Sequence, residues 1–326
     1  MCAVTVSVAL ASYLGRSFIT EQLRSICDQS MPPSEVIVFD DASDDGTRDV
    51  VKAFAAQSSV QIVPRQQSEN QGLIGNFESA IRATTGDIVF LSDQDDVWYP
   101  NKIARVVEAF DRNPAVSLVF SDADLVDQQL RPLRRTLWQS IGFNQTERAQ
   151  MRSPAAFDLL LRKFLVTGAT LAFRRSVFDL VLPLSKHLIH DAWIGLTIAA
   201  ISRVECIDEP LIQYRQHVRQ QIGERESWRN WLTQWQAAKK MSPAYFHEQH
   251  LFFKQLADRV VICEPRWVHP AVGELAKQKL RHLERRIAIR GRGAWSLPAV
   301  AREFARGDYS RFSYGWKSAA QDMFIS

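Results

Sequence analysis

Cysteine, glycine and proline are all scarce in this chain. Its 326 residues include four cysteines, 14 glycines and 13 prolines. The cysteines lie far apart and form no Cys-x-x-Cys pair, which argues against a structural zinc site and against a disulfide framework. With 46% hydrophobic and 23% charged residues, the composition predicts a globular protein with an ample core. We expect it in a reducing compartment, the cytoplasm.

Long hydrophobic runs are missing as well. Residues 1–15 are apolar but lack the basic residues that begin a signal peptide, and their alternating valines predict a strand. The longest uncharged apolar run further along, from Ala192 to Ser202, is too short to cross a bilayer. We therefore expect neither a secretion signal nor a membrane-spanning segment.

The net charge of +4 conceals two regions of opposite sign. Residues 1–220 carry 22 Lys and Arg against 26 Asp and Glu, whereas residues 221–326 carry 18 against 10. The two regions therefore face different partners. We predict a first domain over residues 1–220 and a basic, Trp-rich helical region over residues 221–326.

The basic region contains two helical patterns. Trp228, Trp231, Trp235 and Ala238 recur at helical spacing, and we expect this stripe to pack the helices on the first domain. Further along lies a basic segment that either contacts anionic lipid or forms a solvated helix face. Contact with lipid would make the protein peripheral on the inner face of the plasma membrane. No nucleic-acid motif accompanies the charge, so we expect no nucleic-acid partner. The segment contains Arg281, Arg285, Arg286, Arg290 and Arg292, interleaved with Leu280, Leu283, Ile287, Ile289 and Trp295.

Strands and helices alternate through the first hundred residues. Such alternation predicts an α/β domain with a doubly wound, mostly parallel sheet. Ligands of these sheets bind beyond the carboxyl ends of the strands. The expected strands are Thr5–Ala11, Glu35–Asp40, Val60–Arg65 and Asp87–Ser92, and the expected helices are Phe18–Gln29, Gly46–Gln57 and Ile74–Thr84.

The most informative segment is an apolar strand, Ile88–Ser92, that ends in Asp93, Asp95 and Asp96. Clustered acids repel one another unless they are solvated or neutralised, and their oxygens are ligands for hard divalent cations. The segment therefore predicts a metal site. The alternative is an ordinary acidic turn in which Asp96 caps the helix after Pro100.

Two other strand ends carry polar loops. Residues 40–47 form a second acidic loop, and residues 11–15 are small and polar, with Tyr13 as a wall for a flat ligand. Two adjacent acidic edges suit a nucleotide and its metal. Neither a Walker loop nor a Gly-x-Gly-x-x-Gly fingerprint occurs there. Asp122 and Asp124, after a later strand, either line an acceptor cleft or form a turn.

Four motifs in order carry a family resemblance. The chain resembles family 2 glycosyltransferases of the GT-A fold in Val-Ser-Val-Ala-Leu-Ala-Ser-Tyr (6–13), Val-Ile-Val-Phe-Asp-Asp-Ala-Ser-Asp-Asp-Gly-Thr (36–47), Asn-Gln-Gly-Leu-Ile-Gly-Asn (70–76) and Ser-Asp-Gln-Asp-Asp-Val-Trp-Tyr-Pro (92–100). A weaker similarity continues to about residue 220, through 167–175, 190–193 and 214–217. The resemblance implies a Rossmann-like sheet flanked by helices, followed here by a C-terminal helical appendage.

The resemblance also implies a nucleotide pocket. Asp41 matches the acid that reads the uracil or thymine of the donor. Gly72 matches the glycine of the loop that closes over the donor. Asn76 matches the polar residue that opens the helix behind this loop. Leu14 departs from the pattern, because many members have Asn there. The remaining nucleotide-binding residues implied are Ala11, Ser12, Tyr13, Asp40 and Asp93.

Metal and catalytic roles follow in the same way. Asp93 and Asp95 match the Asp-x-Asp motif, with Asp95 as the direct ligand of a Mg²⁺ or Mn²⁺ ion on the diphosphate. His217 falls where the family often has a third metal or diphosphate contact. Asp191 falls where the family has its general base, and the apolar residues around it are expected to raise its basicity. On the residues alone, the favoured alternative is that Asp191 is the N-cap of the helix expected over Ala192 to Ser202.

The implied activity is metal-dependent, inverting sugar transfer to a saccharide or lipid-linked saccharide in cell-surface polysaccharide synthesis, such as that of lipopolysaccharide. The motifs at 92–98 and 214–217 look most like those of rhamnosyltransferases, so we expect deoxythymidine-diphosphate (dTDP) rhamnose as donor, and a UDP-sugar as the next choice. No Gln-x-x-Arg-Trp motif of processive synthases occurs. A nucleotidyltransferase of related fold and a non-catalytic sugar-nucleotide-binding protein are the alternatives.

Overall fold

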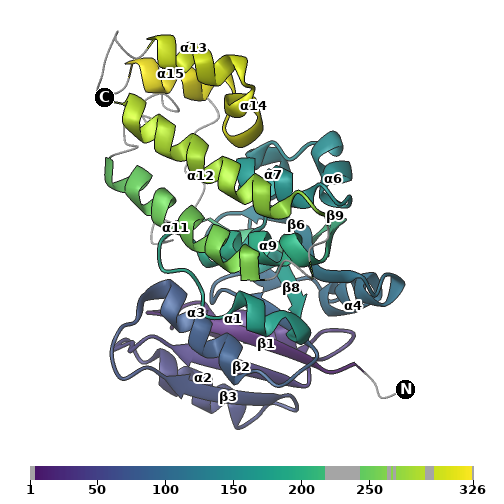
Figure 1. Ribbon diagram of the computed structural model, residues 1–326. Coiled ribbons are helices and arrows are strands. Elements are labelled where there is room, and N and C mark those ends of the chain that lie inside the picture. The colour runs from purple at the N-terminus through teal and green to yellow at the C-terminus, as the bar shows by residue number, and fades with distance from the viewer. Residues whose placement is uncertain (1–3, 217–242, 263–265, 267–268, 291–296, 325–326) are drawn as a thin grey trace.

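The computed structural model describes residues 4–216, 243–262, 266, 269–290 and 297–324. Within them, one nine-stranded sheet runs in the order β3-β2-β1-β4-β8-β6-β9-β5, with β7 paired to β6 and helices on its flanks (Figure 1). The strands are β1 (Val6–Ser12), β2 (Glu35–Asp40), β3 (Gln61–Gln66), β4 (Ile88–Ser92), β5 (Val97–Trp98), β6 (Val116–Val126), β7 (Pro132–Thr136), β8 (Leu171–Arg174) and β9 (Arg203–Arg215).

The first half of the sheet is the predicted one. Strands β3, β2, β1 and β4 are parallel neighbours, and their bounds agree with the predicted strands to within about a residue. Every residue of β1 and β4 is buried, as expected for strands covered on both faces. The predicted crossover helices are also present, as α1 (Ile19–Cys27), α2 (Thr47–Ala55) and α3 (Gly72–Ala83).

The second half of the sheet is mixed. Strand β8 lies antiparallel between β4 and β6, whereas β6 and β9 pair in parallel. The regular strand–helix alternation ends after β4, and the chain then returns through a β6–β7 hairpin and several short helices. The α/β class is confirmed, with most parallel pairing in the first half. The helices are α4 (Lys102–Arg112), α5 (Leu137–Ile141), α6 (Gln145–Met151), α7 (Ala156–Arg162), α8 (Phe178–Val181) and α9 (His190–Ile201), with 3-10 turns η1 (Gly168–Thr170) and η2 (Arg175–Val177).

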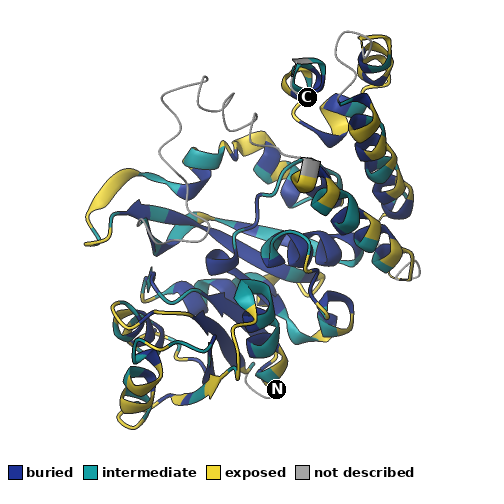
Figure 2. Cartoon of the chain, turned by 90° about the vertical axis from the view of Figure 1, so that its left-hand side faces the viewer, coloured by how far each residue is buried: buried dark blue, intermediate teal, exposed yellow. Residues whose placement is uncertain are grey.

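The C-terminal region is helical, as predicted. Helix α11 (Pro243–Ile262) packs against α12 (Val272–Ile289) and α9, and α12 also packs against α7. Buried phenylalanines of α11, among them Phe252 and Phe253, belong to the same hydrophobic core as the sheet, and Figure 2 shows the buried stripes along these helices. The last helices are α13 (Leu297–Ala305), α14 (Asp308–Phe312) and α15 (Trp316–Phe324). The predicted tryptophan stripe at residues 228–238 lies outside the described residues.

The arginines of α12 bind acids of the same helical region. Arg286 is 5% exposed and donates to Asp322 at 2.6 and 3.0 Å, and Arg290 donates to Asp322 at 3.1 Å. Arg285 binds Glu303 at 2.7 Å, and Arg281 binds Glu274. The expectation of a solvated basic face is therefore wrong for Arg286 and Arg290, because both hold helices together from inside. Arg292 and Trp295 lie outside the described residues. In the part of the chain described, no helix combines the length and apolarity needed to cross a bilayer.

Candidate active site

A cavity of about 620 Å³ opens beyond the carboxyl ends of β1, β2 and β4. One wall comes from the loops after these strands and from α3. The other wall comes from the later part of the chain, including Leu137 and Ile141 of α5, Phe164 and Tyr214. The predicted site residues that line the cavity are Ala11, Ser12, Tyr13, Asn76, Asp41, Asp93, Asp95 and Asp191.

Gln94 joins the first loop to the acidic loop. Its side-chain amide accepts a hydrogen bond from Tyr13 N at 2.8 Å and donates one to Tyr13 O at 2.9 Å. Gly15 makes this contact possible, because a Cβ at that position would lie 2.1 Å from the amide oxygen. Gln94 was not among the predicted residues, since an amide between acids carries no signal of such a bridge in the sequence.

Leu14 lies in the left-handed region, with φ of +52°. Asn adopts this conformation more readily than Leu, which explains why the resembled family favours Asn here. The backbone N–H of Leu14 donates to Ser43 Oγ at 2.9 Å, so the first loop is tied to the second acidic loop.

The two acids of the second loop have different surroundings. Asp41 lines the cavity and accepts a hydrogen bond from Gln71 N at 2.7 Å, which ties it to the segment before α3. Asp40 is 1% exposed and does not line the cavity. Its carboxylate instead accepts hydrogen bonds from Ser43 N, Ser43 Oγ and Ser12 Oγ, at 2.9, 2.6 and 3.2 Å. The expectation that Asp40 lines the nucleotide pocket is therefore wrong, because these hydrogen bonds turn it inward to hold the loop.

Helix α3 begins with Gly72, whose φ of +72° favours glycine. Gly72 itself does not line the cavity, and the neighbouring Leu73 does. Asn76 is 2% exposed, and its Nδ2 donates to Ser12 O at 3.2 Å and to Phe39 O at 2.9 Å. Its Oδ1 has no hydrogen-bond partner among the described residues. The donor-loop role of Gly72 therefore stays a prediction, whereas Asn76 is aligned at the cavity wall.

The acidic loop carries closely coupled charges. Burial, together with the neighbouring Asp95 and Asp191, raises the pKa of Asp93 to about 7. Burial and then Asp95 and Asp93 raise the pKa of Asp96 well above its ordinary value. Asp96 is 1% exposed and accepts a hydrogen bond from Arg215 N at 3.0 Å. Helix α4 starts after Asn101 with no side-chain cap, so the capping role considered for Asp96 is wrong.

Arg215 holds this loop from the end of β9. It is 3% exposed, and its guanidinium donates to Asp95 O and to Glu21 Oε2, each at 2.6 Å, and also to Gln128 O. The sequence places Arg215 in a motif near the end of the first domain but gives no sign of these contacts. The arrangement positions the backbone of Asp95 so that its side chain reaches the cavity.

A buried lysine lies near the same acids. Lys102 of α4 is fully buried, donates to Ala169 O at 2.7 Å and lies 3.8 Å from the centre of the Trp98 ring. Burial lowers the pKa of Lys102 to about 7, although Asp96 and Asp93 act in the opposite direction. Nothing in the sequence singles out this lysine, because a lone Lys in an amphipathic helix usually points to solvent. It supplies part of the positive charge that the acidic loop requires.

Asp191 occupies the second position of α9, behind the N-cap residue Ile189. Its carboxylate accepts hydrogen bonds from Gly168 N at 3.1 Å and Ala192 N at 2.7 Å. Burial raises the pKa of Asp191 to about 6, against the lowering effect of these backbone N–H groups. The N-cap alternative is wrong, and an aspartate with a pKa near 6 is suited to general base catalysis.

A comparison with known families decides the affiliation of this chain. The model of "Glycosyl transferase family 2" matches residues 7–181, which is more than half of the sequence. The chain belongs to glycosyl transferase family 2. The match includes every predicted site residue except Asp191 and His217.

Two relatives are similar to this family 2 chain over about two thirds of its length. The uncharacterized glycosyltransferase alr2836 of Nostoc sp. is 29% identical over 224 residues, 65% of this chain and 65% of its own length. The dTDP-rhamnosyl transferase RfbG of Shigella flexneri is 26% identical over 228 residues, 66% of this chain and 73% of its own. The chain thus spans just under two thirds of the length of the Nostoc protein.

Two solved structures share the fold of this family 2 chain. Staphylococcus aureus TarS, residues 1–349 in complex with UDP-GlcNAc, superposes with a TM-score of 0.58 at 16% identity, over 86% of this chain and 72% of that one. The mannosyltransferase PcManGT of Pyrobaculum calidifontis, in complex with GDP-Man and Mn²⁺, gives 0.53 at 18% identity, over 98% and 85%. At these identities the similarity shows a GT-A-like fold.

The family 2 site offers hard oxygen ligands for a divalent cation. Asp93 and Asp95 both line the cavity, and burial, followed by the charges of Asp95 and Asp191, raises the pKa of Asp93. Among the described residues, only His282, Glu303 and Asp308 bring three ligand atoms within 4.8 Å of one another. Glu303 already binds Arg285 and Arg306, so its charge is balanced by the protein. The acidic loop therefore fits a metal that takes its other ligands from elsewhere, and His217 lies outside the described residues.

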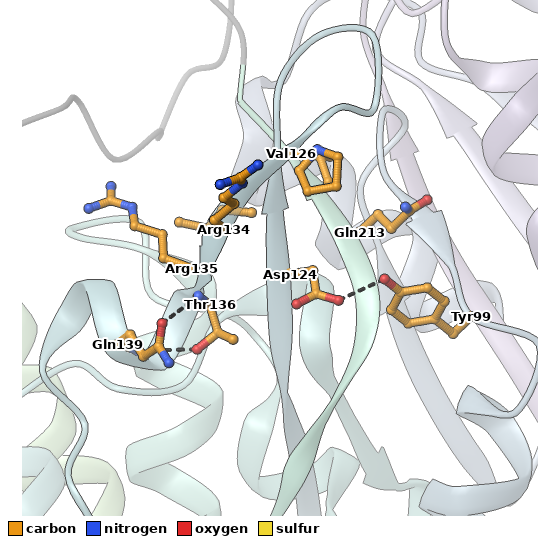
Figure 3. A pocket seen from close by; sticks show the side chains of 10 residues that line it. Tyr99, Asp124, Val126, Arg134, Arg135, Thr136, Gln139 and Gln213 are labelled. Carbon is orange, nitrogen blue, oxygen red and sulfur yellow. Dashed lines mark hydrogen bonds between the residues drawn. The ribbon is translucent and has the colours of Figure 1, made fainter.

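Asp122 and Asp124 lie outside the main cavity. Asp122 accepts a hydrogen bond from Trp138 N at 2.9 Å and thereby supports the start of α5. The predicted turn role is wrong, because both acids lie within β6 (Val116–Val126). Asp124 lines a smaller cavity of about 330 Å³ between β6, β7 and β9, where the Tyr99 hydroxyl donates to it at 2.7 Å. Arg134 lies on the β7 side of this cavity (Figure 3). The acceptor-cleft role considered for the two acids therefore has no support at the larger cavity.

Proposed function

We propose that this chain is an inverting, metal-dependent glycosyltransferase. It moves a sugar from a nucleoside diphosphate donor to a saccharide or lipid-linked saccharide acceptor in cell-surface polysaccharide synthesis. The observation that carries the proposal is that one cavity is lined by Asp41, by the pair Asp93 and Asp95, and by Asp191. A base-reading acid, a metal-binding pair and a general base are the three functions that this reaction requires.

The nucleotide would occupy the wall formed by the first two loops. Asp41 would accept a hydrogen bond from the N3–H group of a uracil or thymine, and Tyr13, which is 40% exposed, would offer its ring to the base. We favour a dTDP-sugar, specifically dTDP-rhamnose, and a UDP-sugar as the next choice. The activity for which the Shigella relative is named supports the first choice.

Asp95 and Asp93 would hold the divalent cation, Mg²⁺ or Mn²⁺. The cation, when bound, stabilises the negative charge that develops on the departing diphosphate. Arg215 keeps the Asp95 backbone fixed, and Gln94 keeps the first loop against the acidic loop. These contacts preorganise the carboxylates, so little reorganisation is needed as the reaction proceeds.

Asp191 would act as the general base. The acceptor hydroxyl attacks the anomeric carbon while Asp191 takes its proton, and the bond from that carbon to the diphosphate oxygen breaks. One displacement of this kind inverts the anomeric configuration and releases the nucleoside diphosphate. No covalent sugar intermediate and no second carboxylate nucleophile are required.

A thermal-shift panel tests the donor site. The wild type and Asp95→Ala are melted with UDP, dTDP, GDP and CDP, each with and without Mn²⁺. We expect UDP or dTDP to raise the melting temperature of the wild type only when Mn²⁺ is present, and the rise to be lost in Asp95→Ala. Asp124→Asn, an acid outside the cavity, is the matched control and should behave as the wild type does.

Three outcomes would contradict the proposal. No shift of the folded wild type with any nucleotide would leave the acidic loops as ordinary turns. If Asp191→Asn responds normally to nucleotide and transfers sugar as fast as the wild type, Asp191 is not the general base. If the wild type and Asp191→Asn both respond normally to nucleotide but neither transfers sugar, the chain is a non-catalytic sugar-nucleotide-binding protein.

A further inference from the structure

His190 is a buried polar side chain of the cavity to which the proposed mechanism gives no task. It is 5% exposed, precedes Asp191 and lines the same cavity. Neither Nδ1 nor Nε2 has a hydrogen-bond partner among the described residues. A buried polar group without a partner is destabilising, so packing alone does not account for a histidine here.

The imidazole is held in one orientation by its neighbours. Its ring stacks on Phe77 of α3, with a centroid distance of 4.3 Å and an interplanar angle of 22°. On another side it approaches Gly168 so closely that a Cβ there would lie 2.7 Å from Nε2. Phe77 and Gly168 therefore define a slot for a flat ring, and the residue that fills the slot is part of the cavity lining.

The charge state of His190 limits the ligands that suit it. Burial lowers the pKa of His190 to about 4, so the ring is neutral at physiological pH. A neutral imidazole offers one N–H donor and one acceptor nitrogen. This pair of groups matches a sugar hydroxyl, which both donates and accepts, whereas a diphosphate calls for positive charge.

A second residue of the cavity lining has an unsatisfied polar atom. Asn76 precedes Phe77 in α3, and both hydrogens of its Nδ2 are directed to Ser12 O and Phe39 O. The amide is thereby fixed with Oδ1 unpaired, and Asn76 also lines the cavity. Two uncharged polar side chains of the cavity lining, one from α3 and one from α9, thus have buried polar atoms without a partner among the described residues.

The packing of His190 on α3 indicates which sugar it meets. Helix α3 belongs to the half of the domain that carries Asp41 and the first loop, whereas α5 and Phe164 supply apolar residues on the other wall. We propose that His190, together with Asn76, hydrogen-bonds hydroxyl groups of the donor sugar and so determines which sugar the site accepts. This inference rests on the proposed function and names the residues that recognise the transferred group.

The variant His190→Phe tests the inference, because Phe retains the ring, the volume and the stacking on Phe77 but removes both nitrogens. Titration calorimetry with Mn²⁺ measures the binding of UDP, dTDP, UDP-glucose and dTDP-rhamnose. For the sugar nucleotide that the wild type binds, we compare its Kd with the Kd of the corresponding nucleoside diphosphate. We expect the ratio of these two Kd values to be about tenfold higher in His190→Phe than in the wild type, which is the effect of one lost hydrogen bond. The Kd of the nucleoside diphosphate should stay within about twofold.

Two accompanying measurements separate sugar recognition from a structural role. The melting temperature of ligand-free His190→Phe should equal or exceed that of the wild type, because two unpaired buried nitrogens are removed. His190→Gln, whose amide also donates and accepts, should recover part of the lost binding ratio. His187→Phe, which replaces a histidine that pairs with Glu248 outside the cavity, should leave the ratio unchanged.

Other results would overturn the inference. An unchanged ratio in His190→Phe would mean that His190 does not touch the sugar. An equal loss of affinity for sugar nucleotide and nucleoside diphosphate would indicate that the residue only supports the fold of the cavity. If the folded wild type binds none of the four nucleotides, the proposed function is overturned as well. This result differs from a failure of the sugar-recognition inference alone, because in that case the wild type still binds nucleotide.

Discussion

At the scale of single residues, Asp191 owes its basicity to two opposing effects. Its carboxylate accepts hydrogen bonds from the backbone N–H groups of Gly168 and Ala192, which favour the ionised form. Burial outweighs these hydrogen bonds and raises the pKa of Asp191 to about 6. A carboxylate of this kind is ionised at neutral pH and yet holds a proton more strongly than an ordinary aspartate. It can therefore take a proton from an acceptor hydroxyl and release it afterwards.

The pH dependence of sugar transfer follows from this pKa. Below pH 6, Asp191 of the folded protein is increasingly protonated and cannot act as base, so kcat/KM should fall about tenfold per pH unit and be level above about pH 7. Asp191→Asn should lower kcat by roughly 10²–10⁴-fold. Initial rates of nucleoside diphosphate release between pH 4.5 and 8.5 measure both, with Asp124→Asn as control. If the residual activity of Asp191→Asn falls at low pH in the same way, the fall is caused by the protonation of another group.

At the scale of elements, α4 links the acidic loop to the interior. The loop after β4 leads through β5 into this helix, whose first residue, Lys102, turns back to donate to Ala169 O. The helix therefore places a cation in the core behind Asp93 and Asp96, with the Trp98 ring over it. A lysine there reduces the repulsion within the loop without occupying the cavity.

Lys102→Met should tighten binding of the divalent cation. Met keeps much of the side-chain length but removes a positive charge that competes with the metal for the acids. The pKa of Lys102 is about 7, so the lysine is charged below that pH and the effect should be larger at pH 6.5 than at pH 8.5. Calorimetry with Mn²⁺ and UDP should show roughly a threefold to tenfold lower Mn²⁺ Kd at pH 6.5.

The exposed Lys52 of α2 supplies the control, and Lys52→Met should leave the Mn²⁺ Kd unchanged. Weaker Mn²⁺ binding in Lys102→Met would mean that the lysine chiefly shapes the loop, with its charge secondary.

At the scale of the whole molecule, the C-terminal helices are held together by a buried polar network. Asp322 of α15 is 3% exposed and accepts hydrogen bonds from Arg286 and Arg290 of α12, and from the Tyr309 hydroxyl at 2.9 Å. Helix α15 packs on α12, α13 and α14, whereas α11 and α12 pack on α9 and α7 of the first domain. The network therefore joins the last helices to the part of the appendage that touches the catalytic half.

Asp322→Ala should loosen the last helices and leave the nucleotide site in place. Removing one partner of a buried ion pair costs about 3–5 kcal/mol, because the arginines remain buried without their acid. Limited proteolysis should cut the variant within α13–α15 first, and UDP or dTDP with Mn²⁺ should still raise the melting temperature of the remainder.

Asp179→Ala is the comparison, since the Arg266–Asp179 pair is exposed and should contribute less than about 1 kcal/mol. Equal protease resistance of the wild type and Asp322→Ala would show that the apolar contacts alone hold these helices.

The sequence by itself determined the parallel half of the sheet and the acids on one wall of the cavity. Continuous apolar runs and a regular alternation are local signals, and the carboxyl ends of parallel strands meet at one edge, so the order of residues alone places Asp41, Asp93 and Asp95 together. Asp191 was assigned by resemblance alone, because nothing near it in the chain indicates that α9 returns to that edge.

Tertiary structure decided the remainder, since it depends on contacts between distant segments. Asp40 and Asp41 are adjacent and alike in sequence, yet only folding turns the first inward and the second to the cavity. The roles of Gln94, Lys102 and Arg215 arise from partners in other elements, and the same holds for the buried arginines of α12. Sequence patterns specify which elements form, whereas burial and pairing of individual charges exist only once those elements pack.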